Sequence, residues 1–276
     1  MNRIKSGDLS VIAILCVILL LFTSCHSFEN TQEAIPIIDT VDFEYNDLSI
    51  SAKQVSRDDT KAISVEFSIE NNSTYEYEIS STAVIINNGM TDLTYEFVIE
   101  GKERSIDQLY IPFEAIESAG IIEVGHIEIY FDVQNRTTNE SMINAGVLIV
   151  KMSEPSLPIV SGHILYNQNG IKIYGQYVDE TTVWGSSVLL YVQNTSDKNI
   201  IVSCEQVAVN DCDMMVAYHK VIYTNKHSVD NIPLASTNMN VNEINSSDSI
   251  VLKLKIIDSD TMNVIDETNP LGFYAN

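Results

Sequence analysis

The sequence predicts an all-β protein with two tandem immunoglobulin-like antiparallel β-sandwich domains after an N-terminal signal peptide. Three features support this prediction: a short apolar segment near the N-terminus, apolar residues that alternate with polar ones, and a pattern that recurs after 123 residues. The chain has 276 residues, of which 45% are hydrophobic and 19% charged. This composition provides enough apolar material for packed cores and argues against a disordered chain.

Residues 1–24 have the features of an export signal. Arg3 and Lys5 precede an apolar run at Val11–Phe22. A helix that spans a bilayer needs about 20 apolar residues, whereas the apolar region of a signal peptide needs only about 7 to 15. The length of the run therefore predicts export and not a transmembrane helix.

The residues after this run, Leu21-Phe22-Thr23-Ser24-Cys25, resemble a bacterial lipoprotein signal. In such a signal a small residue precedes a cysteine that receives diacylglycerol and becomes the new N-terminus. The resemblance implies lipidation of Cys25 and attachment to the extracytoplasmic face of the cell membrane. Phe22 departs from the usual aliphatic residue at its position. The alternatives are an ordinary secretory signal cleaved near Ser24 and an uncleaved anchor.

Residues 25–40 show no apolar periodicity, which is typical of a tether that holds a domain away from a membrane.

An internal repeat organises the rest of the chain. A shift of 123 residues aligns residues 46–150 with 169–273 without a gap. We therefore predict one domain at 41–152 and a second at 163–276. The segment 153–162 contains prolines and no pattern, so it is the predicted linker.

Alternation of period two predicts strands within each repeat. Ile63, Val65, Phe67 and Ile69 alternate with polar residues, as expected of a strand with one buried face. Asn-rich turns follow at Asn71-Asn72-Ser73 and Asn87-Asn88-Gly89, with copies at Asn194-Thr195-Ser196 and Asn210-Asp211. About seven strands per repeat fit an immunoglobulin-like sandwich. One short helix is expected at Pro112–Ala119, ended by Gly120.

The charge of the chain excludes general electrostatic binding to polyanions. Lys and Arg number 15 against 38 Asp and Glu, which gives a net charge of -23 and a pI near 4.3. Such a chain is repelled by nucleic-acid phosphates and by anionic lipid surfaces. We therefore expect no nucleic-acid partner, and contact with the membrane only through the lipid on Cys25.

Recognisable catalytic motifs are missing from the sequence. The five histidines, His26, His126, His163, His219 and His227, form no His-Glu-x-x-His pattern, and the chain has neither a Gly-x-Ser-x-Gly elbow nor a Gly-rich phosphate loop. We predict no catalytic residue, no cofactor and no metal site.

Two Asp-x-Asp pairs, Asp211 with Asp213 and Asp258 with Asp260, suggest calcium ligands. They lack the Gly and Glu of an EF-hand loop, which favours solvated turn carboxylates instead.

An aromatic cluster specific to the second repeat is the candidate ligand site. Tyr174, Tyr177 and Trp184 stand where the first repeat has Ser51, Gln54 and Lys61. If Tyr174 and Trp184 approach across a hairpin, their rings offer a flat apolar face to a sugar ring or a peptide. The alternative is that Trp184 packs against the edge of the core.

The two remaining cysteines are Cys204 and Cys212. An exported protein can form disulfides, but eight residues of extended strand span about 27 Å, well beyond the reach of a disulfide. Two free thiols are favoured unless the chain bends near Asn210.

A lipoprotein signal, a tether, strands that end in Val-x-Asn-x-Ser (Val192–Ser196) and a Val-x-Val-Asn turn (Val207–Asn210) together resemble the tandem immunoglobulin-like surface lipoproteins of Firmicutes, especially clostridia. The understood members of this family act in binding or envelope maintenance, and the motifs that carry the resemblance are fold motifs, so it implies location and architecture without assigning any functional residue. We predict a lipid-anchored extracytoplasmic binding or scaffolding protein without catalytic activity, whose partner is an envelope protein or a glycan. The alternatives are a hydrolase, a carbohydrate-binding hydrolase accessory and a passive envelope spacer.

Overall fold

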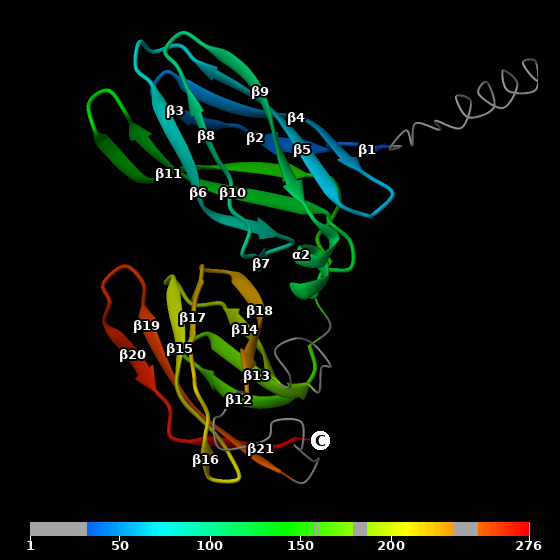
Figure 1. The fold of residues 1–276 in the computed structure, drawn as a ribbon, viewed down its shortest axis with the longest axis vertical. Helices are drawn as coiled ribbons and strands as arrows, with labels where there is room; N and C mark the ends of the chain where they lie inside the picture. The colour runs from blue at the N-terminus through cyan, green and yellow to red at the C-terminus, as the bar shows by residue number, and fades with distance from the viewer. Residues whose placement is uncertain (1–31, 157, 159, 179–186, 235–247, 276) are drawn as a thin grey trace, which may run out of the picture.

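The computed structural model describes residues 32–156, 158, 160–178, 187–234 and 248–275. These residues form two antiparallel β-sandwiches stacked end to end, with α2 (Phe113–Ser118) near the junction (Figure 1). The predicted all-β sandwich fold is confirmed. The predicted signal peptide and Cys25 lie outside the described residues. Within those ranges, no helix has both the length and the apolar character needed to cross a bilayer.

The first sandwich packs two sheets around one hydrophobic cluster. One sheet contains β1 (Glu33–Ile35), β3 (Phe43–Tyr45), β4 (Leu48–Arg57), β5 (Ile63–Asn71) and β9 (Arg104–Ile111). The facing strands are β2 (Asp39–Val41), β11 (Glu140–Lys151), β10 (His126–Asn135), β6 (Tyr77–Ile86), β7 (Gly89–Met90) and β8 (Glu96–Ile99). Phe67 on β5 and Phe131 on β10 are buried in the same cluster, so both sheets contribute to this core.

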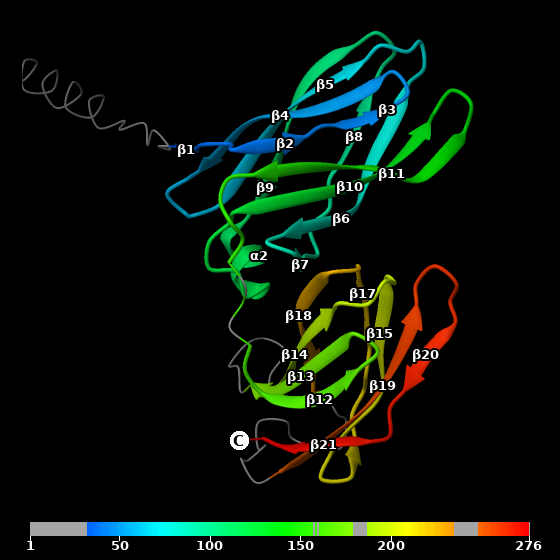
Figure 2. The same ribbon diagram turned by 180° about the vertical axis from the view of Figure 1, so that it is seen from behind.

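The second sandwich has its own hydrophobic cluster. One sheet contains β12 (His163–Gln168), β13 (Ile171–Val178), β14 (Ser187–Asn194) and β18 (Lys226–Pro233). The facing sheet contains β15 (Ile200–Val209), β16 (Cys212–Asp213), β17 (Tyr218–Ile222), β19 (Ser249–Asp258), β20 (Val264–Glu267) and β21 (Leu271–Tyr274). Leu190 on β14 and Ile256 on β19 are buried in the same cluster, so both sheets contribute to this core. Figure 2 shows both sandwiches from behind.

The two sandwiches share one Greek-key strand order. In the first, β4, β5 and β9 form one sheet while β8, β6, β10 and β11 follow in that order in the other. The corresponding strands of the second are β13, β14 and β18, and β17, β15, β19 and β20. Strands that align at the 123-residue shift therefore occupy equivalent places, as an immunoglobulin-like fold requires.

Local sequence explains the strands and turns. The core-facing residues Ile63, Val65, Phe67 and Ile69 of β5 are all fully buried, as their alternation predicts. The predicted turn after β6 has positive φ at Asn87 (50°) and Asn88 (64°). Its copy after β15 has the same conformation. Both fit the type I′ hairpin turn, which needs two left-handed residues.

The predicted helix is present as α2. Pro112 precedes its first residue, Ile116 is buried in the first core, and Gly120 follows with φ 70°. Proline has no amide hydrogen to lose at the start of a helix, and glycine adopts the left-handed conformation that ends one.

Candidate functional site

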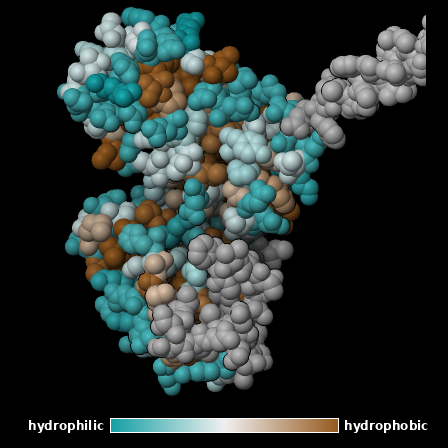
Figure 3. Space-filling model, in the orientation of Figure 1, coloured by the Kyte–Doolittle hydropathy of each residue, from teal (hydrophilic) through white to brown (hydrophobic). Residues whose placement is uncertain are grey.

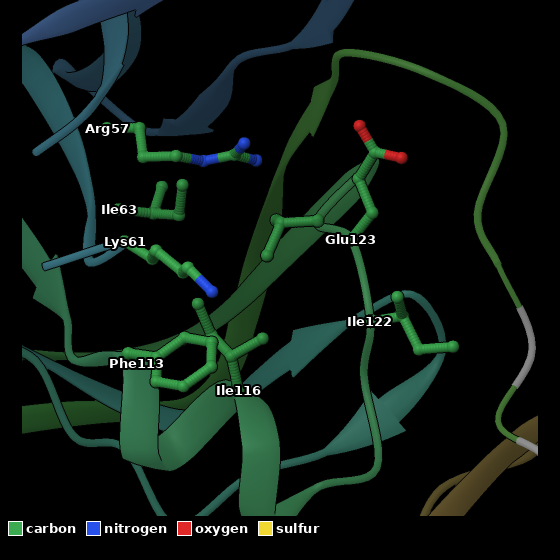
Figure 4. A pocket seen from close by; sticks show the side chains of 8 residues that line it. Arg57, Lys61, Ile63, Phe113, Ile116, Ile122 and Glu123 are labelled. Carbon is green, nitrogen blue, oxygen red and sulfur yellow. The ribbon is translucent and has the colours of Figure 1, made fainter. Parts of the chain in front are cut away.

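A hollow opens where the β4–β5 hairpin meets α2 (Figure 4). The hairpin contributes Arg57, Lys61 and Ile63, α2 contributes Phe113 and Ile116, and the following segment contributes Ile122, Glu123 and Val124. The volume of the hollow is about 190 Å³. Pockets for drug-sized ligands measure about 300–1,000 Å³, so this one suits a group about the size of one amino acid.

A tight turn positions the two cations of the hollow. Arg57 ends β4, and the carboxylate of Asp58 accepts hydrogen bonds from the Thr60 hydroxyl at 2.6 Å, the Thr60 amide at 2.8 Å and the Ala62 amide at 3.1 Å. The hydrogen bond from the Thr60 hydroxyl is the main reason that the pKa of Asp58 is lowered. Lys61 completes the turn with φ 67°. An Asp that binds its own turn in this way fixes the backbone on which Arg57 and Lys61 stand.

The opposite wall of the hollow is apolar. Ile116 and Val124 on this wall are buried residues of the first core, and Ile63 on the hairpin side is fully buried. The Lys61 ammonium lies 5.1 Å from the centroid of the Phe113 ring. A cation over an aromatic face is held there by the ring quadrupole, so Lys61 stays at the hollow without a carboxylate partner.

The hollow concentrates positive charge in a strongly acidic chain. Ion pairs engage eight of the described lysines and arginines: Arg104, Arg136, Lys151, Lys198, Lys220, Lys226, Lys253 and Lys255. Arg57 and Lys61 form no ion pair among the residues that the structure describes. Figure 4 shows both side chains directed into one space, with the Glu123 carboxylate on its far side. The arrangement is therefore suited to an anion with an apolar portion.

A buried ion pair joins the two sandwiches. The Lys226 ammonium on β18 contacts Glu128 on β10 and lies 3.1 Å from the Asn88 side-chain oxygen. The side chains of Lys226 and Glu128 are only 11% and 6% exposed. The Tyr130 hydroxyl donates a hydrogen bond to Glu128 at 3.0 Å. Burial, followed by the nearby carboxylate, raises the pKa of Tyr130.

The backbone and a buried histidine complete this junction. The His227 amide donates to the Asn88 carbonyl at 2.9 Å, and His227 forms a parallel bridge with Gly89. This bridge makes β6, β7, β18 and β14 part of one 10-stranded sheet. A side chain at Gly89 would approach the His227 ring to 3.1 Å, so glycine permits the contact. Burial and then the charge of Lys226 lower the pKa of His227 to about 4.

Further contacts extend the junction to both sides. Ile85 and Met90 of the first sandwich belong to the second hydrophobic cluster. The Lys220 ammonium lies 2.5 Å from Asp92 in the first sandwich and 3.3 Å from Asp230 in its own. Burial is the main cause of a raised pKa at Asp230. The sandwiches are thus joined by apolar, ionic and backbone contacts.

A second, wider hollow of about 370 Å³ lies along this junction. Its walls include Tyr130 and Tyr223, whose rings meet edge to face at 5.1 Å, together with Asn144 and Asn199. The space-filling view shows apolar residues on both sides of the indentation between the domains (Figure 3).

Tyr174 and Tyr177 of the predicted aromatic cluster do not lie on the same face of the sheet. Tyr174 and Tyr177 are three residues apart on β13, so strand alternation places them on opposite faces. Tyr177 packs against the second core, whereas Tyr174 contacts the Tyr191 ring at 6.0 Å on the outer face. The third member, Trp184, lies outside the described residues. Cys25, the predicted lipidation site, also lies outside them.

Of the two Asp-x-Asp pairs, Asp211 and Asp213 are exposed, and Asp213 accepts a hydrogen bond from the Gln206 side chain at 3.0 Å, whereas Asp258 is buried. Asp258 accepts hydrogen bonds from the Asp260 and Thr261 amides and from Lys198 at 2.8 Å, and the Lys198 contact is the main reason that its pKa falls to about 2. Across the described ranges, no group of three or more His, Cys, Asp or Glu side chains is placed to hold a metal ion.

Cys204 and Cys212 are free thiols. In the β15–β16 hairpin Cys212 pairs with Val209, while Cys204 on β15 pairs with Tyr218 on β17. Burial raises the pKa of the Cys204 thiol to about 11, so it remains protonated and unreactive at neutral pH.

Sequence reasoning missed Arg57, Lys61 and the junction residues Glu128 and Lys226. The available signal at the hollow was a pair of cations flanking an Asp-Asp-Thr turn in a chain with few cations. That signal does not show that α2, more than fifty residues away along the chain, supplies the apolar wall.

Comparisons with known proteins give only distant likenesses. No family model matches the chain, and neither does any curated protein. Red sea bream transglutaminase is 9% identical with a TM-score of 0.27. The match covers 78% of this chain but only 29% of the transglutaminase chain. The adhesin domain of Epf from Streptococcus pyogenes is 11% identical with a TM-score of 0.21, covering 84% of this chain and 80% of that domain. Neither likeness is close enough to assign a function.

Proposed function

We propose that this chain is a lipid-anchored extracytoplasmic protein that binds or scaffolds an envelope partner and has no catalytic activity of its own. The observation that supports this role best is the junction, where the buried pair Lys226–Glu128 and the bridge at Gly89–His227 fix one sandwich on the other. A fixed pair of sandwiches holds its surfaces at constant spacing, as a scaffold must. Because β1 and β2 pair with β4 and β11 of the first sandwich, only the part of the predicted tether that precedes β1 would link this body to a lipid on Cys25.

The membrane part of the proposal is tested by fractionation. Wild-type protein should sediment with membranes and be labelled by a palmitate analogue, whereas Cys25→Ser should appear in the soluble exported fraction without label. A matched Cys16→Ser change lies in the predicted signal and should leave attachment unchanged. Retention of Cys25→Ser on the membrane would contradict lipid anchoring.

The binding part is tested by chemical cross-linking in intact cells, followed by capture of the tagged chain. One recurrent envelope protein or glycan should be recovered with the wild type and lost when the junction is disrupted by Lys226→Met. If recovery of that partner does not depend on the junction, the two sandwiches do not act as one scaffold. A hydrolase assay panel on the purified chain should be negative, and activity there would contradict the non-catalytic role.

A further inference from the structure

We propose that the hollow formed by Arg57, Lys61, Phe113 and Ile116 binds a carboxylate attached to an apolar or aromatic group of about one residue in size. The inference deepens the proposed binding role by giving it a site and a ligand class. Both a free organic acid and the C-terminal residue of a peptide carry this chemistry, and the experiment below distinguishes them.

Charge selects the carboxylate. Neither Arg57 nor Lys61 has a carboxylate partner among the described residues, although the chain carries 38 acidic and 15 basic side chains. A chain with a net charge of -23 repels anions over most of its surface. A local pair of free cations therefore distinguishes this hollow from its surroundings. Arg57 offers a planar fork that fits two carboxylate oxygens, and Lys61 adds a second charge.

The apolar wall favours a ligand whose carboxylate is attached to an apolar or aromatic group. Ile116 and Val124 belong to the packed core and Phe113 is fixed on α2, so the wall exists before a ligand arrives. Ile122 is 74% exposed at the rim, which leaves an apolar surface for the ligand to cover. The volume of about 190 Å³ leaves room for one side chain with its carboxylate.

Glu123 lies on the far side of the hollow from Arg57 (Figure 4). It forms no ion pair with Arg57 or Lys61. Its carboxylate repels a ligand anion slightly and keeps the anion near the two cations. Glu123→Gln removes this repulsion and is therefore expected to strengthen carboxylate binding.

The test is titration of the purified full-length chain with N-acetyl-phenylalanine, followed by NMR and calorimetry. N-acetyl-phenylalaninamide, which has the same shape without the charge, should bind at least about tenfold more weakly, because it cannot form charge-assisted hydrogen bonds with Arg57 and Lys61. Acetate, which lacks the apolar group, should also bind about tenfold more weakly. Equal binding of the acid and the amide would overturn the proposal. This comparison uses the wild-type protein and requires no variant.

Two variants locate the binding. Arg57→Gln and Lys61→Asn should each weaken N-acetyl-phenylalanine about tenfold or more, and asparagine suits the left-handed backbone at Lys61. The matched control is Lys102→Asn, which removes the same charge from another left-handed turn position, with φ 66°, away from the hollow. An equal loss in the control would show general charge attraction and overturn the proposal, as would loss of binding in Glu123→Gln.

A peptide that ends in phenylalanine assigns the source of the carboxylate. Tighter binding of this peptide than of N-acetyl-phenylalanine, lost on amidation of the chain end, would support capture of a C-terminus. Binding of the small acid alone would support a free organic acid. Because these titrations use isolated protein, their failure leaves membrane anchoring and partner capture to be judged by their own experiments.

Discussion

Two asparagines fasten the same corner in each sandwich. Asn71 and Asn194 are completely buried, and their side-chain amides donate to two backbone carbonyls each, at 2.7 and 2.9 Å and at 2.8 and 3.0 Å. The side-chain oxygens accept from the amide and hydroxyl of the serine two residues later. A buried amide with all its hydrogen bonds satisfied tolerates little replacement.

We expect Asn71→Ala to cost about 3 kcal/mol of unfolding free energy, because the amide and hydroxyl of the buried Ser73 lose their acceptor and two backbone carbonyls lose a donor. Each buried group left unsatisfied costs about 1–3 kcal/mol. Urea unfolding measures this as a lower midpoint at constant slope. The neighbouring Asn72 is exposed, so Asn72→Ala should change stability by less than about 0.5 kcal/mol. Equal costs at the two positions would contradict the role of the buried amide.

His227 should make stability depend on pH. Its folded pKa of about 4 lies below its usual value of 6.5, so the folded state favours the neutral ring. The stabilisation is complete above pH 6.5 and is lost as the pH falls toward 4, because the unfolded chain takes up the proton first. The shift corresponds to about 3 kcal/mol.

Unfolding free energies at pH 7.5 and 4.5 test this prediction. The difference between them should shrink by about 2–3 kcal/mol in His227→Gln. The exposed His219 provides the control, and His219→Gln should keep the pH dependence of the wild type. The same pH dependence in wild type and His227→Gln would assign the acid sensitivity to other groups.

The hairpin turn after β15 depends on the left-handed backbone conformation of its two residues. Asn210 and Asp211 have φ of 49° and 64° after β15, and the Asp211 side chain is exposed. Glycine adopts this conformation freely, while alanine meets a penalty of about 1 kcal/mol or more. We expect Asp211→Gly to stabilise the chain by about 1 kcal/mol and Asp211→Ala to destabilise it.

Both changes remove the same charge, so their difference in melting temperature isolates the backbone contribution. If Asp211 instead held calcium, both variants would lose a calcium-dependent rise in melting temperature. The same shift in both variants would contradict the turn argument.

Strands and turns could be predicted because their signals are local. Alternation in β5 and paired asparagines after β6 are visible within ten residues of sequence. The same alternation separates Tyr174 from Tyr177, since an odd spacing on a strand puts two side chains on opposite faces. Divergence between the two repeats at these positions therefore does not place the two tyrosines on one surface.

At the scale of the whole molecule, the junction was beyond sequence reasoning. Residues Ala83–Ile86 of β6 are buried on both faces, which alternation alone does not predict. Their outer face is covered by the second sandwich, whose contacting strand β18 lies more than 130 residues later in the chain. The hollow at Arg57 has the same cause, because its two walls are distant in sequence. Contacts of this kind depend on how folded segments that are distant in the sequence pack against each other, which local sequence patterns do not show.

The buried ion pair Lys226–Glu128 at the junction contributes to the stability of both sandwiches. Lys226→Met leaves the Glu128 charge buried with Tyr130 as its remaining hydrogen-bond donor. Removal of one partner of a buried ion pair costs about 3–5 kcal/mol, whereas replacement of both is often nearly neutral. We therefore expect Lys226→Met to lower the free energy of unfolding by about 3 kcal/mol, and the double variant with Glu128→Gln to recover most of it.

Calorimetry measures this at the level of the molecule. Wild-type protein should unfold in one transition because each sandwich stabilises the other, and Lys226→Met should separate it into two. The exposed pair Arg104–Glu70 provides the control, since Arg104→Met should cost less than about 1 kcal/mol and keep a single transition. If Lys226→Met also keeps a single transition at unchanged temperature, the coupling between the sandwiches rests on the apolar contacts of Ile85 and Met90 and on the bridge at Gly89, and the ion pair sets only their orientation.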